Sequence, residues 1–567
     1  MAYKRLGDIL LSAKVVTEEQ LENALRESKE SGLRLGEYLI KKGLLTEHQL
    51  IDVLRLQLGV DFVDLNDTKI PMEMARLVPK NIARTEGVIP VKAEGNTVYL
   101  AMKDPLNFRA ISTVRKLTGK RVIPMIAEEE ALTKSIATLY GNESVAKAIT
   151  DLQESITDSG LVDDALSDAV SYNSTDEEAA PTIRLVNSFL ERAIAEKASD
   201  VHIEPRADGL CIRMRIDGVL HTMLTIPTSL QNAVISRIKI MGDMDIAERR
   251  IPQDGRAQLR IKDKDYDMRI STLPNIYGEK VVIRFLEKSA SLLTSDGIGL
   301  VGEHLKDYES LIHNANGVIL ISGPTGSGKS TTMYTMIAEL ANDEINVTTL
   351  EDPIEYNING VNQVQVNEKA GMNFANGLRA ILRQDPDIIG VGEIRDEETA
   401  EIAMRAAITG HLVLSTIHTN SAIATLDRLL DIGIEPYLIA SALKGVVSQR
   451  LVRKICPNCK EAYKPSDEEL SALNITPEQG RNLTFYRGCG CSECLNTGYR
   501  GRTGVFEILT LTRDVKELFR DRAPHKEIVD EIMRSNFKPL LVDARKLVLN
   551  GTTTVSEAQK ILHTTDD

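Results

Sequence analysis

Apolar residues recur along this 567-residue chain with changing spacing, and each spacing predicts a different kind of element. Residues 1–60 carry apolar side chains three and four positions apart, which is typical of amphipathic helices. In residues 87–140, short apolar runs alternate with helical stretches and predict a small α/β unit. A helix is expected from residue 182, and a fully apolar strand at Val318 to Ile321. The pattern therefore predicts a multidomain α/β protein.

A β-hairpin is expected where Asp217-Gly218 separates two runs of alternating apolar and polar residues. Because side chains of a strand alternate between its faces, Arg213 and Arg215 share one face of the first run. Such a face is either simply solvated or reaches the phosphates of a partner molecule. The pattern leaves both interpretations open.

Composition narrows the class of protein. With 42 % hydrophobic and 26 % charged residues the chain has an ordinary globular balance, and no apolar run approaches the ~20 residues that span a bilayer. The start MAYKRLGDIL lacks the features of a signal peptide, so a cytoplasmic protein is expected. A net charge of −14 argues against a broad nucleic-acid surface.

Two linkers are expected from composition. Residues 142–180 are rich in Asp, Glu, Ser and Ala and predict a solvated linker, and a second short linker is expected near residues 288–297.

A duplicated segment opens the chain: RLGDILLSAKVVTEEQL returns as RLGEYLIKKGLLTEHQL. Thr17 and Thr46 occupy equivalent places in the two copies, and each is expected to cap a helix. The shared positions include the pairs Arg5/Arg34, Leu6/Leu35, Gly7/Gly36, Leu21/Leu50 and Leu25/Leu54.

A phosphate-binding loop is predicted at Gly323-x4-Gly328-Lys329-Ser330, because an apolar strand precedes this motif and a helical pattern follows it. The glycines let backbone N–H groups approach phosphate, Lys329 reaches the β- and γ-phosphate oxygens, and Ser330 ligates Mg²⁺. The residues expected to bind nucleotide are Gly323, Pro324, Thr325, Gly326, Ser327, Gly328, Lys329, Ser330 and Thr331.

Three later strands end in polar residues. Glu351, Asp352 and Glu355 follow one apolar strand, Glu393 follows the next, and His418 follows a third. In a parallel sheet these ends gather beside the phosphate loop, where a carboxylate can orient or deprotonate water and a histidine can sense the γ-phosphate.

Five of the six cysteines lie between residues 456 and 494. The pairs Cys456-x2-Cys459 and Cys491-x2-Cys494 suit a closed tetrahedral zinc site of a structural kind. Cys489 lies close enough to leave the register of the second pair open, and incidental buried thiols are the alternative interpretation.

Residues 181–567 resemble the secretion ATPase superfamily, which includes the type IV pilus assembly ATPases and the type II secretion ATPases. The motifs that carry this resemblance are GPTGSGKSTT, EDPIEY, LRAILRQDPDIIGVGEIRDEETA, TGHLVLSTIHTNSA, QRLVRKICPNC and CLNTGYRGRTGVFEIL. Gly390 departs from the usual Met of the family but removes only bulk. The cysteine element argues against the retraction ATPases, which generally lack it.

The resemblance implies specific roles. Glu393 would be the catalytic glutamate of the Walker B segment, and Arg213 and Arg215 would face nucleotide. Asp352 and Glu355 would form an aspartate box, and His411 and His418 a histidine box. It also implies a homohexameric ring, peripheral at the inner face of the cytoplasmic membrane, that uses ATP and Mg²⁺ to drive an inner-membrane platform protein. The acidic balance, not the resemblance, argues that no nucleic acid is bound.

The duplicated start resembles the MshEN domain, which binds cyclic di-GMP. Its second copy keeps Gly43 and Gln57, whereas the first has Lys14 and Ser28 at those places. A duplicated motif suits this two-fold symmetric ligand; an adaptor that docks on a membrane partner is the alternative. The implied ligand contacts are Arg5, Leu6, Gly7, Leu21, Leu25, Arg34, Leu35, Gly36, Leu50, Leu54 and Gln57.

These interpretations predict a regulatory domain at 1–145, a linker at 146–180, a PAS-like N-terminal half of the motor at 181–290, and a RecA-like ATPase domain at 291–567. The ATPase domain includes a zinc element at 451–504 and C-terminal helices. The expected function is a pilus assembly motor regulated by cyclic di-GMP. A type II secretion motor and a nucleotide-gated adaptor with little hydrolysis are the alternatives, and a nucleic-acid translocase is disfavoured by the acidic balance.

Overall fold

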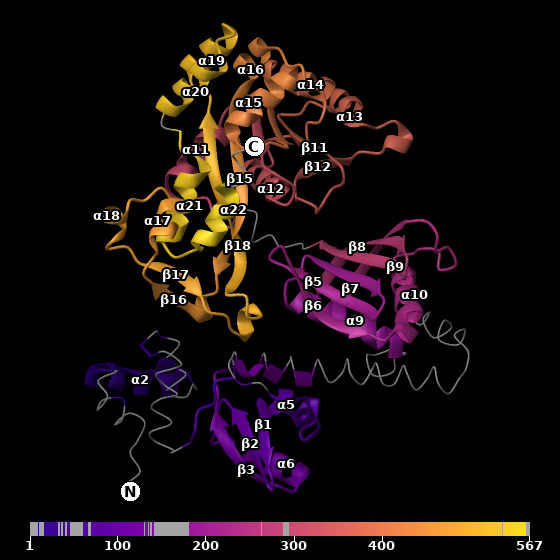
Figure 1. Ribbon diagram of the computed structural model, residues 1–567, viewed down its shortest axis with the longest axis vertical. Helices are drawn as coiled ribbons and strands as arrows, with labels where there is room; N and C mark the ends of the chain where they lie inside the picture. Colours follow the sequence, from indigo (N-terminus) through magenta and orange to yellow (C-terminus); the bar gives the residue numbers. More distant parts are fainter. Residues whose placement is uncertain are drawn as a thin grey trace. The chain divides into compact units, whose positions relative to one another are not determined.

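The computed structural model (Figure 1) describes residues 10, 16–31, 35, 38–39, 42, 44–45, 60–65, 68, 70–129, 131–133, 135–136, 139–140, 181–261, 264–286, 294–535 and 537–562. The described chain divides into two compact units, residues 1–257 with 268–284, and residues 285–567 with 258–267. The linker predicted at 142–180 and most of the one predicted near 288–297 lie outside the described residues. The fold class is confirmed as multidomain α/β.

The first described helix, α2 (Glu18–Ser31), begins where the sequence predicts it. The backbone N–H of Gln20 donates to Thr17 Oγ1 at 3.3 Å, and the backbone N–H of Thr17 donates to Gln20 Oε1 at 2.9 Å. This reciprocal cap satisfies two N–H groups that the first helical turn leaves open. Thr46, the equivalent residue of the second copy, lies outside the described residues.

The small α/β unit is also present as predicted. Strand β1 (Val88–Glu94) pairs antiparallel with β2 (Thr97–Met102), and β2 pairs parallel with β3 (Arg121–Ile126). Helices α5 (Lys80–Glu86) and α6 (Phe108–Thr118) contribute to the apolar core of this sheet.

A mixed α+β domain follows, with strand order β6-β5-β4-β9-β8-β7. Its elements are α9 (Pro181–Ala195), β4 (Asp200–Arg206), β5 (Gly209–Ile216), β6 (Val219–Ile226), α10 (Gln231–Met241), β7 (Gln253–Ile261), β8 (Lys264–Asn275) and β9 (Gly278–Leu286). Asp217 and Gly218 join β5 to β6 with φ angles of 48° and 84°, which confirms the predicted hairpin turn.

The second unit is built on a sheet of order β12-β11-β13-β14-β10-β15-β18, in which β18 alone runs antiparallel to its neighbour. The strands are β10 (Gly317–Ser322), β11 (Val347–Glu351), β12 (Val361–Gln365), β13 (Ile388–Val391), β14 (Leu412–Ile417), β15 (Leu443–Ile455) and β18 (Tyr499–Thr510). The helices around it are α11 (Gly302–Ile312), α12 (Lys329–Leu340), α13 (Phe374–Ile381), α14 (Glu397–Ile408), α15 (Ala422–Asp431), α16 (Pro436–Ala442), α19 (Arg513–Arg520), α20 (His525–Arg534) and α21 (Leu540–Leu549).

Both faces of this sheet are covered, which explains why residues Val318 to Ile321 of β10 are all apolar. Val318 and Leu320 belong to a core that includes side chains of α13 to α16, α19 and α20. Ile319 and Ile321 belong to a second core with side chains of α11 and α12. Parallel strands buried on both faces are typical of doubly wound nucleotide-binding sheets.

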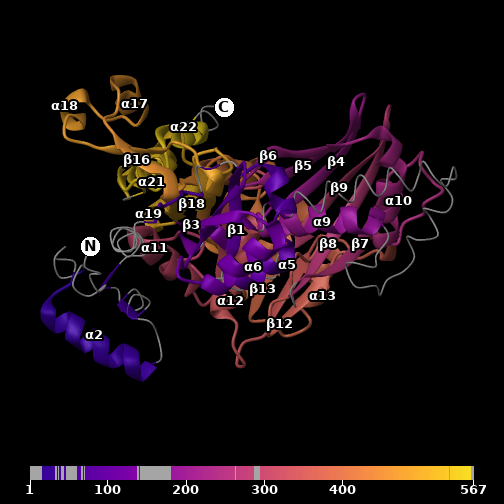
Figure 2. The ribbon, with the colours of Figure 1, turned by 90° about the horizontal axis from the view of Figure 1, so that it is seen from below.

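The cysteine-bearing segment connects β15 to β18. It contains a small hairpin of β16 (Lys460–Tyr463) and β17 (Phe485–Gly488) and two short helices, α17 (Asp467–Ala472) and α18 (Pro477–Gly480). Figures 1 and 2 both show α17 and α18 at the margin of the second unit.

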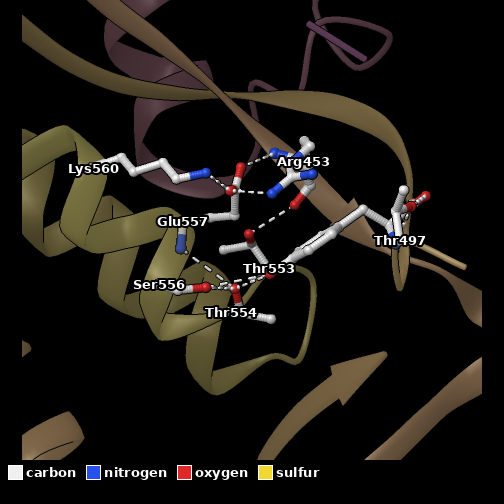
Figure 3. Close-up of polar contacts among 8 residues, drawn as sticks. Arg453, Thr497, Thr553, Thr554, Ser556, Glu557 and Lys560 are labelled. Atoms are coloured by element: carbon white, nitrogen blue, oxygen red, sulfur yellow. Dashed lines mark hydrogen bonds and ion pairs between the residues drawn. The ribbon is translucent and has the colours of Figure 1, made fainter. Parts of the chain in front are cut away.

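Helix α22 (Val555–Leu562) is fixed to β15 just before the cysteines begin (Figure 3). Arg453 donates from its side chain to Glu557 Oε1 at 2.8 Å and from its backbone N–H to Glu557 Oε2 at 3.1 Å, while Lys560 donates to the same carboxylate at 2.5 Å. The hydroxyl of Thr553 donates to the Arg453 carbonyl at 2.7 Å. Burial would raise the pKa of Glu557, but these hydrogen bonds outweigh it and hold the pKa at about 2.

Candidate active site and four-cysteine cluster

The predicted phosphate loop lies between β10 and α12, in the strand–loop–helix arrangement that the sequence indicates. Gly323 has a φ of 149° and comes so close to its neighbours that a Cβ would lie 2.6 Å from the carbonyl oxygen of Gln449. Gly328 precedes the helix with a φ of 90°. Both positions therefore favour glycine for their backbone conformation, and Gly323 also for space.

Lys329 points back into the loop that it closes. Its Nζ donates to the carbonyl oxygens of Gly323 at 2.9 Å and Pro324 at 3.2 Å, and the residue is 9 % exposed. Burial lowers the pKa of Lys329 to about 8, against the opposing influence of Glu393. A buried ammonium group held by backbone carbonyl oxygens can pair with a phosphate anion that enters the loop.

Glu393 and His418 lie beside Lys329, so the structure brings three predicted residues together. His418 Nδ1 is 3.5 Å from Lys329 Nζ, and His418 Nε2 is 3.8 Å from Glu393 Oε2. This meeting follows from the topology, because β13, β14 and β10 are adjacent and parallel. Burial and the charge of Lys329 lower the pKa of His418, so its imidazole is neutral at pH 7.

Arg395 is a site residue that the sequence reasoning missed. Its guanidinium forms an ion pair with Glu393, two positions earlier, and the side chain of Glu393 is 17 % exposed. The hydrogen bond to Glu393 raises the pKa of Arg395, and the charge of Asp352 contributes. The sequence already contained a sign of this pair, because Arg395 stands two residues after Glu393, which itself follows a strand.

Glu351 does not match the expectation for a strand-end carboxylate. It is 3 % exposed and accepts hydrogen bonds from Tyr334 Oη, from Thr349 Oγ1 at 2.5 Å and from Gln363 Nε2 at 3.1 Å. A carboxylate whose oxygens are occupied inside the core cannot orient water, so this interpretation was wrong for Glu351. Glu355 remains a candidate, and its backbone N–H donates to Tyr334 Oη at 3.1 Å.

His411 also lies apart from the site. It precedes the first residue of β14, whereas His418 follows the last, and six residues of extended strand separate the two edges by roughly 20 Å. His411 Nδ1 contacts the carbonyl oxygen of Ala406 at 2.8 Å. It belongs to the turn between α14 and β14.

Gln449 on β15 is a second residue that the sequence reasoning missed. Its Nε2 donates to the carbonyl oxygen of Ser327 at 2.7 Å, and its Oε1 accepts from Thr332 Oγ1 at 2.7 Å. It thus holds the phosphate loop and the first turns of α12 against the sheet. Gln449 opens the quoted motif QRLVRKICPNC, but its contact with the phosphate loop could not be foreseen because its partners lie more than a hundred positions away.

Arg213 and Arg215 lie in the first unit and are engaged there. Arg213 Nη2 is 2.7 Å from Glu204 Oε1, and Arg215 Nε is 3.7 Å from Asp200 Oδ2. Burial would raise the pKa of Glu204, but hydrogen bonds from Arg213, Arg206 and Lys280 hold it at about 2. The expected meeting of these arginines with nucleotide stays a prediction.

The four predicted cysteine ligands form one buried cluster. The sulfur atoms of Cys456, Cys459, Cys491 and Cys494 all lie within 4.8 Å of one another, with contacts of 3.7 Å to 3.9 Å. Four ligands at ~2.3 Å from a tetrahedral zinc ion would stand about 3.8 Å apart. Cys489 is exposed and its sulfur contacts the Cys459 carbonyl oxygen at 3.1 Å, which settles the register.

Backbone N–H groups point at these sulfur atoms, as they do around thiolate ligands. The N–H of Gly490 lies 3.3 Å from Cys459 Sγ, and that of Gly498 lies 3.2 Å from Cys494 Sγ. The cluster therefore has the ligands, spacing and hydrogen-bond donors for a closed zinc site.

The structure describes few of the expected cyclic di-GMP contacts. Leu21 is 7 % exposed and packs in a small core with Leu10, Tyr38 and Leu39. Leu25, on the same helix, is 42 % exposed, and Leu35 is partly buried. Of the remaining expected contacts, none lies within the described residues: Arg5, Leu6, Gly7, Arg34, Gly36, Leu50, Leu54 and Gln57.

The covered parallel sheet, the glycine loop closed by Lys329, and Glu393 beside it define a P-loop nucleoside triphosphatase. The chain belongs to the type II/IV secretion system protein family, whose model matches residues 175–560, and it is an ATPase of that family. An MshEN domain model matches residues 58–146, which follow the duplicated segment. No helix among the described residues is long and apolar enough to cross a bilayer.

Known relatives share most of this chain. It is 38 % identical over 555 residues to the type IV pilus assembly ATPase PilB of Myxococcus xanthus, covering 98 % of each chain. It is 41 % identical over 499 residues to the type II secretion system protein E of Pseudomonas aeruginosa, covering 88 % of this chain and 98 % of that protein. The X-ray structure of the Legionella pneumophila ATPase DotB matches with a TM-score of 0.50 at 20 % identity, covering 66 % of this chain and 95 % of the other, and shares the fold.

Proposed function

We propose that this chain hydrolyses ATP to power assembly of a type IV pilus. The observation that carries the proposal is the end-to-end match with a pilus assembly ATPase, which covers 98 % of both chains and so includes the N-terminal region. The type II secretion relative matches 88 % of this chain. Type II secretion is the second candidate, supported by that similarity.

The chain's own residues would divide the chemistry as follows. Lys329 would contact the β- and γ-phosphate oxygens, and Ser330 would ligate the Mg²⁺ ion that accompanies ATP. Glu393 would orient the attacking water and take its proton as the bond from the γ-phosphorus to the leaving oxygen breaks, giving ADP and phosphate. Neutral His418, between Lys329 and Glu393, could hydrogen-bond the γ-phosphate without adding charge. Glu355, in the loop after β11, would be a second catalytic carboxylate that helps to orient the attacking water.

A host strain in which Glu393→Gln replaces the wild-type gene tests the biological role. Surface pili counted by electron microscopy should disappear while secreted proteins remain unchanged. A normal number of pili together with loss of secreted proteins would instead support the secretion motor.

The chain would assemble into a homohexameric ring that acts on an inner-membrane platform protein. Within that ring, Arg213 and Arg215 would complete the ATP site by approaching the nucleotide held in the phosphate loop. The ion pair of Arg213 with Glu204 must open or turn for the guanidinium to meet phosphate. Replacing both arginines with alanine should lower the ATPase rate of a hexamer without dissociating it. An unchanged rate in such a hexamer would mean that the two side chains only stabilise the sheet.

Zinc is the ion that the four-cysteine cluster would hold, in a structural role. All four sulfur atoms are buried and no coordination position would remain open for a substrate.

Cyclic di-GMP is the regulatory ligand proposed for the N-terminal region, supported by the MshEN domain match and by the duplicated Arg-Leu-Gly motif. Full-length protein with Arg34→Ala should bind fluorescent cyclic di-GMP more weakly than Arg5→Ala protein, because the second copy keeps Gly43 and Gln57. Loss of a charge-assisted contact should cost roughly ten- to a hundred-fold in affinity. Absence of binding to wild-type protein at tens of micromolar ligand would leave the adaptor role.

A further inference from the structure

Tyr334 on α12 connects the helix that follows the phosphate loop with the segment between β11 and β12, residues 352–360, which is called the acidic loop below. It lies on α12 five positions after Lys329, so its Cα is about 7.5 Å further along the helix axis. The residue is 1 % exposed, and its ring meets the ring of Tyr356 edge to face, with centroids 4.5 Å apart. The packing alone would be served equally well by phenylalanine.

The hydroxyl of Tyr334 makes two further contacts that a phenylalanine would lose. It donates to Glu351 Oε2 and accepts a hydrogen bond from the backbone N–H of Glu355 at 3.1 Å. Because the carboxylate can only accept, the hydroxyl proton must point at Glu351, which leaves an oxygen lone pair for the N–H of Glu355. One buried oxygen atom thereby fixes the backbone at Glu355.

Gln363 on β12 holds the next residues of the acidic loop. Gln363 Nε2 donates to Glu351 Oε1 at 3.1 Å and to the carbonyl oxygen of Tyr356 at 3.2 Å, while its Oε1 accepts from the N–H of Ile358 at 2.8 Å. Tyr334 and Gln363 therefore meet on the same carboxylate, Glu351. The loop has no regular secondary structure between β11 and β12, so these side chains define its path.

We propose that Tyr334 is a positioning residue for ATP hydrolysis: through its hydroxyl it sets the backbone of Glu355 relative to the helix that follows the phosphate loop. The buried Glu351 serves as the shared anchor of this arrangement. The proposal rests on the proposed role of Glu355. It implies that a displacement of α12, when the phosphate loop binds or releases nucleotide, is transmitted to the acidic loop.

The chain provides a matched control. Tyr308 on α11 is also fully buried, belongs to the same apolar core, and donates its hydroxyl to a carboxylate, Glu339 Oε2, at 2.8 Å. Glu339 lies on the same helix as Tyr334, but near its other end. Tyr308→Phe and Tyr334→Phe thus remove the same kind of hydrogen bond from the same core, and only the second touches the acidic loop.

The test measures steady-state ATP hydrolysis, binding of a fluorescent ATP analogue and thermal unfolding in full-length protein. Tyr334→Phe should lower kcat about 10- to 100-fold, because small misplacements of catalytic groups have effects of this size. KM and the affinity for the analogue should stay within about threefold. Tyr308→Phe should show a comparable decrease in Tm and an unchanged kcat. An equal loss of kcat in both variants, or no loss in Tyr334→Phe, would overturn the proposal.

Glu355→Gln separates this proposal from the one on which it rests. If Glu355 is not catalytic, Glu355→Gln retains kcat and the proposed role of Glu355 fails. If Glu355→Gln lowers kcat and Tyr334→Phe does not, only the positioning role fails. If Tyr334 acts through Glu355, the double variant should be no slower than Glu355→Gln alone, because the two changes then remove the same contribution. Fully multiplicative losses would show that Tyr334 acts by another route.

Discussion

The phosphate loop and the four-cysteine cluster are joined by one strand, β15, yet they are built in opposite ways. Gln449 near the middle of β15 contacts the loop, and Cys456 follows the last residue of the same strand. At the loop, polar side chains from several elements converge; Glu393 is 17 % and His418 is 52 % exposed. At the cluster every sulfur atom is buried.

The difference reflects what each site must do with its ligand. A site that binds and releases nucleotide in every cycle needs groups that solvent or ligand can satisfy in turn, and the partly exposed His418 and Glu393 meet this need. A closed thiolate cage would instead gain its stability from a resident ion and give access to none of its ligands. Changes at the loop should therefore affect turnover, and changes at the cluster should affect folding.

Removal of metal should have the largest effect. We expect about one zinc ion per chain, and Cys456→Ser should abolish it, because three thiolates bind far more weakly than four. Structural zinc contributes roughly 10–16 kcal/mol of folding free energy to small domains, so without it the segment between β15 and β18 should unfold at a much lower temperature. Elemental analysis and thermal unfolding check this. The same measurements on Cys489→Ser should match wild type, because Cys489 lies outside the cluster.

Glu393→Gln should have the next largest effect, and on turnover alone. The amide keeps the shape of the side chain but cannot take a proton, so the ATPase rate should fall ~10²- to 10⁴-fold. Binding of ATP, zinc content and Tm should remain close to wild type. Near-normal hydrolysis would remove Glu393 from its proposed role, and a large loss of Tm would show that the two sites are less independent than their construction suggests.

Glu557→Gln tests the clamp beside the cysteines. A pKa lowered from 4.5 to about 2 corresponds to as much as about 3 kcal/mol of folding stability. Since the folded-state pKa is lowered, this contribution is complete above pH 4.5 and is lost as pH falls toward 2. The difference in Tm between wild type and variant should therefore be large at pH 7 and shrink in acid. Glu461→Gln is the control: its partner Arg487 is 61 % exposed, and we expect almost no change.

Gln449→Leu should have the smallest effect and would sharpen the comparison, because this residue belongs to the strand that joins the two sites. The loss of two hydrogen bonds, one to the phosphate loop and one to Thr332 on α12, should weaken ATP binding by about 5- to 150-fold, at ~0.5–1.5 kcal/mol for each bond. Thr332→Val, which removes one of the two, should have a lesser effect. Calorimetric titration with ATP measures both, and an unaffected affinity in Gln449→Leu would contradict a role in shaping the loop.

Local chemistry explains which features could be predicted from the sequence. The phosphate loop, the hairpin at Asp217-Gly218, the cap at Thr17 and the cysteine spacing each depend on residues within a few positions of one another. Glu393 and His418 were found because parallel strands end at a common edge. The MshEN domain was predicted from the duplicated segment, which ends before residue 58. The family model instead matches residues 58–146, which follow that segment.

The missed features depend on distant partners. Glu351 and Glu393 both end buried strands, and nothing nearby in the sequence shows that Tyr334 and Gln363 enclose the first. Gln449 reaches its partners across 117 and 122 positions. Such contacts are decided by how helices pack on the sheet, which the spacing of apolar residues constrains only in outline.

The clamp between Arg453 and Glu557 also bears on how the protein is made. The two residues are 104 positions apart, so at ~5–20 residues per second about 5–20 seconds of translation separate them. All four cysteines leave the ribosome before Glu557 does. A metal ion could thus reach the four thiols of a nascent chain while the end of β15 still lacks the helix α22 that contacts it.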